Sequence, residues 1–233
     1  MLRELLLRSD IQVSEEQLEQ LHRFKELVLE WNEKFNITAI TDPQEFDLKH
    51  LYDCILILKA GVFQPNSRII DIGTGGGFPG IPLKILLPEA EIVLVDSLNK
   101  RIGFLEHVIE TLDLKLVRAQ HARAEEMSRT ASDREKYDLC VSRAVAPMNT
   151  LAEYCLPFVK PGGYFVSMKG SSGQEELKVG KNAIETLGGK VKKSIPYTLL
   201  PNDHQRYIFI IEKVSSTPAK YPRGGGKPKN KPL

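Results

Sequence analysis

The strongest constraint on the fold of this chain is an alternation, from residue 67 onward, of short apolar runs with stretches long enough for helices. Strands that alternate with helices predict a parallel sheet that is covered by helices on both faces. The predicted strands are residues 68–72, 91–96, 114–118, 137–142 and 163–169, and the predicted helices are residues 79–87, 99–112, 148–158 and 173–188.

Two further apolar runs, residues 190–200 and 206–213, close this region. The link between them, "PNDHQ" (residues 201–205), is too short to hold a helix, so we expect the two strands to pair antiparallel. Together these patterns predict an α/β domain over residues 63–213.

Residues 1–62 follow a different pattern and predict a helical layer packed on that domain. The sequence "SEEQ" (residues 14–17) is a capping box, and apolar residues follow it at helical spacing. A second helix is expected to begin at Pro43 and to end at Gly61, because proline favours the first turn of a helix and glycine favours its end.

Residues 214–233 form a third part, which we expect to be a flexible tail. This segment has five basic residues and no acidic one, whereas the net charge of the whole chain is +2, so residues 1–213 carry a net charge of −3. A basic tail on a mildly acidic body predicts a polyanionic partner. The alternative is a disordered tail that only keeps the protein in solution. The basic residues are Lys220, Arg223, Lys227, Lys229 and Lys231.

The composition, 42% hydrophobic and 27% charged, is typical of a soluble globular protein. No apolar run approaches the roughly 20 residues of a membrane span, and the N-terminus lacks the apolar core of a secretory signal. Cys54, Cys140 and Cys155 stand in apolar surroundings, which predicts buried free thiols in a cytoplasmic protein. No metal-ligand spacing occurs among them, so we expect no metal site. We see no dimer signature and expect a monomer.

The first predicted strand runs into a glycine-rich sequence, "IIDIGTGGGFPGIPLKI" (residues 69–85). Gly73, Gly75 and Gly77 can adopt positive φ angles and let a ligand lie against the backbone. Open parallel sheets bind ligands at such a turn, outside the carboxyl ends of the strands. The candidate ligands are a dinucleotide and S-adenosylmethionine, and the match of Gly75–Gly80 to G-x-G-x-x-G is weak support for the first.

Two details of this turn favour S-adenosylmethionine. Asp71 ends the strand two residues before the first glycine, where a carboxylate suits the cationic amino group and sulfonium of the methyl donor. Pro79 and Pro82 also remove amide donors from the helix start, and a dinucleotide needs such amides for its phosphates.

Further candidate site residues follow the next three strands. Asp96 ends the second strand, where a carboxylate can accept both ribose hydroxyls of an adenosyl group in either ligand. Ala124 and Glu125 follow the third strand and are candidates for reading adenine through a backbone amide and an acid. Arg143 leaves the fourth strand at the same edge and is a candidate contact for the cofactor or for a substrate phosphate.

The chain resembles the RsmG (GidB) family of bacterial small-subunit rRNA guanine-N7 methyltransferases over nearly its whole length. The most specific signals are the long glycine motif with its Phe-Pro and the string "DSLNKR". The segments that carry the resemblance are "WNEKFNIT" (31–38), "DIGTGGGFPGIPLKI" (71–85), "LVDSLNKR" (94–101), "RAEE" (123–126), "SRAVAP" (142–147) and "KYPRGGGKPKNKPL" (220–233).

The resemblance implies a class I S-adenosylmethionine-dependent methyltransferase, with a Rossmann-like seven-stranded sheet whose last strand is antiparallel and with an N-terminal helical extension. It implies S-adenosyl-L-methionine as the methyl donor and a guanine in 16S rRNA of the small ribosomal subunit as the acceptor. The implied cofactor contacts are Gly73, Phe78, Ala124, Glu125 and Arg143.

Guanine N7 carries an in-plane lone pair, so direct in-line methyl transfer needs positioning rather than a base. We therefore leave the catalytic residue unassigned. Arg143 is the candidate for that role. Two alternatives stay open: a small-molecule or protein methyltransferase on the same fold, and an RNA-binding protein without turnover. The candidate RNA-binding residues are Lys100, Arg101, Lys220, Arg223, Lys227, Lys229 and Lys231.

Overall fold

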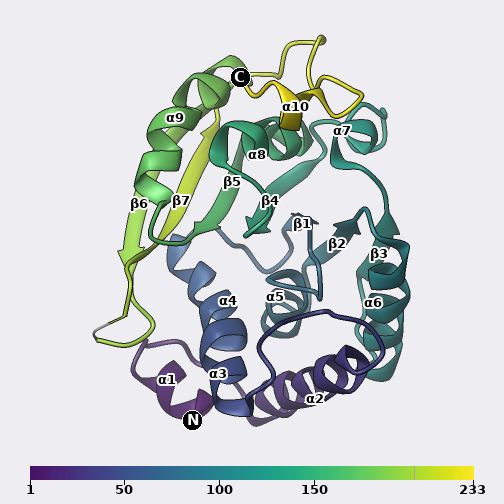
Figure 1. The fold of residues 1–233 in the computed structure, drawn as a ribbon, viewed down its shortest axis with the longest axis vertical. Coiled ribbons are helices and arrows are strands. Elements are labelled where there is room, and N and C mark those ends of the chain that lie inside the picture. Colours follow the sequence, from purple (N-terminus) through teal and green to yellow (C-terminus); the bar gives the residue numbers. More distant parts are fainter. Residues whose placement is uncertain (202) are drawn as a thin grey trace.

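The computed structural model describes residues 1–201 and 203–233 and is built around a seven-stranded sheet with the order β3-β2-β1-β4-β5-β7-β6 (Figure 1). Strands β1 to β5 pair in parallel, and β7 lies antiparallel to both β5 and β6. This confirms the predicted α/β sheet with its last strand reversed. The strands are β1 (Arg68–Ile72), β2 (Glu91–Asp96), β3 (Val117–His121), β4 (Tyr137–Arg143), β5 (Val159–Lys169), β6 (Gly189–Tyr197) and β7 (Arg206–Lys213).

Helices cover both faces of the sheet, because side chains alternate between the faces along each strand. Ile69 of β1 packs into the core beneath the N-terminal helices, α5 and α6, whereas the adjacent Ile70 packs into the core beneath α8, α9 and the C-terminal segment. The helices are α1 (Leu2–Leu7), α2 (Glu15–Asn32), α3 (Pro43–Phe46), α4 (Asp53–Ile55), α5 (Gly80–Leu86), α6 (Asn99–Thr111), α7 (Ala124–Met127), α8 (Met148–Cys155), α9 (Gly173–Thr186) and α10 (Lys227–Asn230).

The third strand lies three residues later than predicted. The apolar residues of "LKLVR" indicated a strand over 114–118, but Leu116 has a positive φ of 52° and belongs to the turn that follows α6. Pairing with β2 begins at Val117, opposite Ile92. β3 is an edge strand with half-exposed side chains, so its hydrophobic pattern carries a weak signal. The predicted link 201–205 joins β6 to β7, and Asn202 within it lies outside the described residues.

The N-terminal helical layer begins as predicted, since Ser14 and Gln17 form both hydrogen bonds of a capping box at the start of α2. The second predicted helix starts at α3 and ends at Gly61, which has a φ of 67°. Between these ends the chain forms a π-helical turn over Asp47–Tyr52, which precedes α4. Such turns are frequent at functional sites, and this one brings His50 toward the carboxyl edge of the sheet.

The C-terminal segment (residues 214–233) is not the flexible tail that its composition predicted. It packs against α7, α8 and the turn after α7, and Tyr221, Pro222 and Pro228 within it are buried (Figure 1). Arg134 donates hydrogen bonds to the carbonyl oxygens of Thr217 and Tyr221. Proline and glycine lower the helix and strand signals, but they leave carbonyls that arginine side chains on the body can bind. The segment therefore has little helix or strand, yet it is ordered against the body of the protein.

Cys54, Cys140 and Cys155 are buried and free, as predicted, and burial raises the pKa of the Cys54 thiol to about 12. In the described part of the chain, the helices are too short or too polar to span a membrane. Those residues also contain no group of three or more side chains placed to hold a metal ion.

Candidate functional site

The glycine-rich turn between β1 and α5 has the backbone geometry that the sequence predicted. Gly73, Gly75 and Gly77 have φ angles of 70°, 60° and 95°, in the left-handed region that favours glycine. A Cβ atom on Gly73 would lie 2.5 Å from a methyl carbon of Val145. The turn therefore requires glycine at residue 73 for its conformation and for the close approach of the loop after β4.

Asp71 organises this turn from within, and it is not among the residues that line the adjacent cavity; its contact with the cationic part of a ligand stays a prediction. Its Oδ2 atom accepts hydrogen bonds from the Thr74 hydroxyl at 2.7 Å and from the Gly80 amide at 2.9 Å. The side chain is fully buried, and burial raises its pKa to about 7 against the opposing effect of these hydrogen bonds. Asp71 thus ties the start of α5 to the end of β1.

A cavity of about 380 Å³, which we call the cofactor cavity, opens at the carboxyl ends of β1, β2, β3 and β4. Its volume lies in the range that accommodates small molecules. Four of the predicted cofactor-binding residues line it: Gly73, Asp96, Ala124 and Glu125. Parallel strands that end at one edge bring these residues together although they are far apart in the sequence.

Asp96 occupies the position in the cofactor cavity that suits a ribose. Its side chain is buried, with Oδ1 accepting from the Leu98 amide at 2.9 Å and Oδ2 from the Gly75 amide at 3.0 Å. Arg101 also donates to Oδ2, at 3.1 Å, and lines the cofactor cavity; its contact with RNA stays a prediction. Each carboxylate oxygen can accept two hydrogen bonds; Oδ2 accepts two and Oδ1 only one from the described residues, so Oδ1 has capacity for a hydroxyl.

Glu125 lies in the first turn of α7, and its carboxylate is buried but lines the same cavity. None of the described residues donates a hydrogen bond to it. Its oxygens are not among the fully buried atoms that lack a partner, so they reach the cavity, where a ligand can donate hydrogen bonds to them. An exocyclic amino group or a ribose hydroxyl of an adenosyl group is such a donor.

A second cavity, of about 490 Å³, adjoins the cofactor cavity, and Ala144 and Val145 line both. It lies at the ends of β4 and β5, between the π-helical turn and the β6–β7 pair. Its polar lining residues come from elements that are far apart in the sequence: His50, Asp53, Arg143, Lys169, Glu176, Tyr197 and Arg206.

Arg143 projects into this second cavity and is held there by the N-terminal layer. Its guanidinium donates to Asp53 at 2.8 Å, to the Lys49 carbonyl at 3.0 Å and to His50 Nδ1 at 2.9 Å. Tyr197 donates to the other oxygen of Asp53 at 2.8 Å. Asp53 and Tyr197 were missed in the sequence, because a buried ion pair across 90 residues leaves no local signal.

His50 is a structural support for Arg143 and remains neutral. Burial, reinforced by the positive charge of Arg143, lowers the pKa of His50 to about 3. The ring stacks on Phe78 at 4.5 Å between centroids, and its Nε2 atom bonds the Thr38 hydroxyl at 2.7 Å. His50 Nδ1 is already an acceptor for Arg143, so the imidazole is not an available base.

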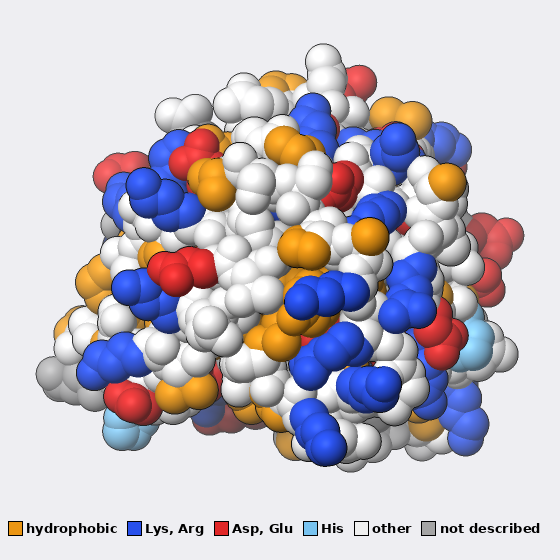
Figure 2. Space-filling view, turned by 90° about the horizontal axis from the view of Figure 1, so that it is seen from above, with side chains coloured by type: hydrophobic (Ala, Val, Ile, Leu, Met, Phe, Trp, Pro, Cys, Tyr) orange, Lys and Arg blue, Asp and Glu red, His pale blue; other side chains and the backbone are white. Residues whose placement is uncertain are grey.

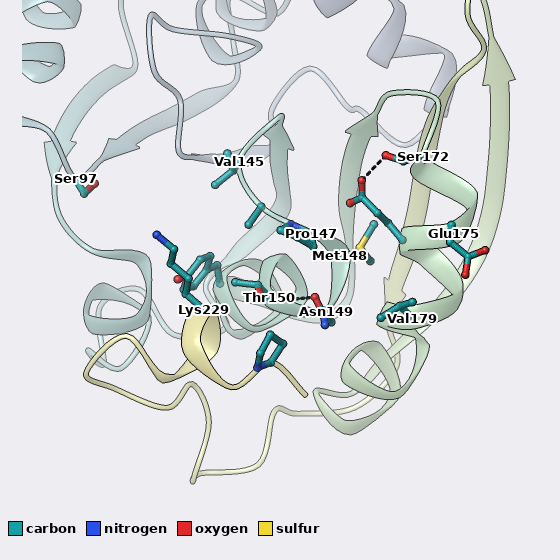
Figure 3. A pocket seen from close by; sticks show the side chains of 14 residues that line it. Ser97, Val145, Pro147, Met148, Asn149, Thr150, Ser172, Glu175, Val179 and Lys229 are labelled. Atoms are coloured by element: carbon teal, nitrogen blue, oxygen red, sulfur yellow. Dashed lines mark hydrogen bonds between the residues drawn. The ribbon is translucent and has the colours of Figure 1, made fainter.

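A third and larger cavity, of about 820 Å³, lies on the other side of Val145. Figure 3 shows Lys229 from the C-terminal helix α10 on one side of it and Glu175 and Val179 of α9 on the other. Val145 lines all three cavities, so the three cavities adjoin one another at the loop after β4.

The family model described as rRNA small subunit methyltransferase G, GidB, matches residues 17–213. The chain belongs to the GidB family. Proteins named Ribosomal RNA small subunit methyltransferase G from Alkaliphilus metalliredigens and Acetivibrio thermocellus are 46% and 48% identical to it. These alignments cover 95% and 96% of this chain and 92% and 91% of the relatives.

A solved structure supports the fold of this GidB-family chain. The precorrin-6y C5,15-methyltransferase of Geobacter metallireducens is 17% identical and aligns with a TM-score of 0.53 over 69% of this chain and 87% of its own. At this identity the likeness shows the fold alone. With the family match, it identifies the sheet as that of a class I methyltransferase.

Two residues that the family resemblance implied as cofactor contacts have side chains outside the cofactor cavity. Phe78 is buried among Phe24, Phe46 and His50, and Arg143 lines the second cavity. Gly75 and Gly77 shape the turn without lining the cavity themselves. Cofactor binding by all these residues stays a prediction.

The basic residues proposed for RNA in this GidB-family chain fall into two groups. Lys100 and the C-terminal lysines 220, 227, 229 and 231 are exposed, and Figure 2 shows lysine and arginine side chains around an apolar hollow on the face that bears the C-terminal segment. Arg223 instead pairs with the buried carboxylate of Glu153 at 2.7 Å. The structure gives Arg223 an anchoring role, which leaves less of its charge for RNA phosphates.

Proposed function

We propose that this protein transfers the methyl group of S-adenosyl-L-methionine to N7 of a guanine in 16S rRNA of the small ribosomal subunit. The observation that carries the proposal is the contact between the two cavities at Ala144 and Val145. One cavity presents carboxylates that suit an adenosyl group, and the other presents cations that suit a nucleotide.

The residues of the cofactor cavity fit S-adenosylmethionine, whose sulfonium supplies an electrophilic methyl group. Asp96 would accept from the ribose and Glu125 from the adenosyl group, while Gly73 lets the methionine part lie against the backbone. The turn starts a helix at Pro79 and Gly80 with Pro82 in its first turn, which leaves few amides for a pyrophosphate. This donor set favours the methyl donor over a dinucleotide.

The acceptor side suits an atom that needs no deprotonation. The groups of the second cavity that could act as a base are engaged: His50 accepts from Arg143, and Asp53 accepts from Arg143 and Tyr197. At guanine N7 the lone pair forms the new N–C bond while the S–C bond breaks, and sulfur keeps that electron pair. The product guanine carries a positive charge, and no proton moves. Alignment of the reacting atoms is therefore the contribution of the protein, worth up to roughly 7–11 kcal/mol.

Relatives named for small-subunit rRNA support the choice of acceptor, and the exposed lysines of the C-terminal segment support a polyanionic one. N7 lies on the major-groove edge, which A-form RNA hides from side chains. The target guanine is therefore expected in a loop or an unpaired strand. A monomer in the cytoplasm remains our expectation for the acting species.

The test is methyl transfer from S-adenosylmethionine with a labelled methyl group to 30S subunits that lack this modification. Borohydride and aniline cleave RNA at N7-methylguanosine, so one labelled cleavage site in 16S rRNA is the expected result. Labelled RNA without cleavage would overturn the N7 assignment. Binding of the donor with no labelled RNA would favour a small-molecule or protein acceptor, or an RNA-binding protein without turnover.

A further inference from the structure

We propose that the second cavity receives the acceptor guanine and that Lys169 recognises its O6 atom. This inference rests on the proposed methylation of guanine N7 and adds the residue that selects the base. Lys169 ends β5, and its side chain is 5% exposed. A charged group this deeply buried is expected to have all its donors satisfied.

Two of the three donors on the Lys169 ammonium have partners within the protein. One bonds the Ala146 carbonyl oxygen, and another bonds Glu176 Oε2 at 2.7 Å. An ammonium group carries three N–H donors, so one remains beside the cavity that Lys169 lines. An acceptor atom on a ligand would complete this set.

Both carboxylates of the cavity are already paired with cations of the protein, whereas cationic donors remain for a ligand. Asp53 is occupied by Arg143 and Tyr197, and Glu176 accepts from Lys169 and from the Ser172 hydroxyl at 2.8 Å. The nearest atom of Asp53 lies 3.8 Å from Arg206, beyond a hydrogen bond, so this guanidinium also has free donors. Among the described residues, the cationic groups of this cavity with free donors are thus Lys169 and Arg206.

A lining of donors distinguishes guanine from adenine. The edge of guanine that holds N7 also holds O6, and both atoms are acceptors, whereas adenine places an amino donor at the position of O6. The fixed ammonium of Lys169 can donate a hydrogen bond to O6 of guanine. It cannot do so to the amino group of adenine, which is itself a donor. The cavity is therefore suited to guanine.

The position of Lys169 also agrees with the direction of methyl transfer. Its partner Ala146 lies in the loop after β4, next to the Ala144 and Val145 that separate the two cavities. A guanine whose O6 meets Lys169 has N7, the adjacent atom on the same edge, near that boundary. Because the ring becomes cationic during transfer, the ammonium does not accelerate the step; it selects and orients the base.

The test combines a change in the enzyme with a change in the RNA. The RNA is 16S rRNA ligated around a synthetic segment and assembled into 30S subunits, with guanosine or 2-aminopurine, which lacks O6 but keeps N7, at the methylated position. Wild-type protein is expected to lose about 10- to 100-fold in kcat/KM on the 2-aminopurine RNA. On the guanosine RNA, Lys169→Met is expected to have a kcat/KM lower than that of the wild type by a similar factor. On the 2-aminopurine RNA, the kcat/KM values of the variant and the wild type are expected to be nearly equal.

A matched control lies on the same strand. Lys160 pairs with Asp138 at 2.5 Å at the other end of β5, and Lys160→Met should keep the full preference for guanosine. Because Lys169→Met leaves Glu176 without its cation, the paired variant with Glu176→Gln is measured alongside it. Cofactor affinity, measured by calorimetry with S-adenosylhomocysteine, reports whether each variant is folded.

The outcomes separate this inference from the proposed function. If Lys169→Met slows methylation of both RNAs by the same factor, Lys169 is only structural and the inference is wrong. Equal rates of the wild-type protein on both RNAs would also overturn it. If wild-type protein does not modify N7 of the guanosine RNA at all, the proposed function itself fails.

Discussion

The guanidinium of Arg223 forms a two-pronged ion pair with the fully buried carboxylate of Glu153. Arg223 Nε lies 3.0 Å from Oε1 and its NH2 atom lies 2.7 Å from Oε2, across 70 residues of sequence. The Arg223 amide donates to the same carboxylate at 2.7 Å. This pair joins the C-terminal segment, whose Lys229 lines the third cavity, to α8.

Arg223→Met is expected to destabilise the protein by about 3–5 kcal/mol, because it leaves the buried charge of Glu153 without its cation. Urea unfolding followed by circular dichroism measures the change. The double variant Arg223→Met, Glu153→Gln removes both charges and should recover most of the lost stability. If the single and double variants were equally unstable, the unpaired charge would not be the cause.

Replacement of Lys227, Lys229 and Lys231 by glutamine is expected to weaken RNA binding and its salt dependence. Each lost phosphate contact lowers the slope of log K against log salt by about 0.7 for single-stranded RNA. Filter binding at several salt concentrations gives the slope, and cofactor affinity should not change. Substitutions are preferred to deletion of residues 214–233, because the deletion would expose the core that Tyr221 and Pro228 cover. An unchanged slope would exclude these lysines from the RNA interface.

Gly73→Ala is expected to weaken cofactor binding at least tenfold. The new Cβ would lie 2.5 Å from Val145 in a backbone conformation with a φ of 70°, and such strain costs of order 1–3 kcal/mol. Calorimetry with S-adenosylhomocysteine measures the loss. Gly103→Ala in α6 is the control, because no atom lies within 4 Å of its Cβ position and alanine favours a helix. Equal affinity of both variants would contradict the assigned role of the glycine turn.

The sequence predicted the sheet because its buried parallel strands give short, continuous apolar runs with turn residues between them. β1, β2 and β7 lie at the predicted residues, whereas the edge strand β3 lies three residues later. The cofactor cavity was also predictable in part, since Gly73, Asp96 and Glu125 each follow a strand at the same edge.

The second cavity could not be predicted in the same way. Asp53, Lys169 and Tyr197 lie in segments without a motif, and long-range hydrogen bonds alone give them their positions. The hydrogen bonds from Thr74 and Gly80 to Asp71 were not predictable either, because its place at a strand end does not tell whether the carboxylate faces outward or toward the turn that follows it. Side-chain direction at a strand end depends on tertiary packing.

Asp96→Ala is expected to raise the dissociation constant for S-adenosylhomocysteine by about 10- to 100-fold. The substitution removes a charged acceptor, whose hydrogen bonds are worth about 1.5–3 kcal/mol, and it frees the Gly75 amide that this carboxylate holds. Asp96→Asn keeps one acceptor oxygen and should lose less. Calorimetry measures both variants, with Asp113→Asn on the exposed turn after α6 as the control. Wild-type affinity of Asp96→Ala would remove this residue from the cofactor site.

The low pKa of His50 predicts that the protein loses stability as the pH falls below about 6.5. The folded protein keeps His50 neutral down to a pKa of about 3, whereas the ordinary value is 6.5, so between these values the unfolded chain binds a proton that the folded one does not. Stability from this group is therefore complete above pH 6.5 and declines as the pH falls toward 3, by at most about 1.4 kcal/mol per pH unit. The charged groups beside it, Arg143 and Asp53, are paired with each other.

His50→Gln isolates this contribution, because glutamine can accept from Arg143 and donate to Thr38 without titrating. The free energy of unfolding is measured in urea at pH 7, 6 and 5 for the wild type, for His50→Gln and for His22→Gln, whose histidine is exposed on α2. Between pH 7 and 5 the wild type and His22→Gln should lose stability along the same slope, and His50→Gln should lose less. Identical slopes for all three proteins would mean that His50 takes up a proton in the folded state, and that its neutral contact with Arg143 is not maintained.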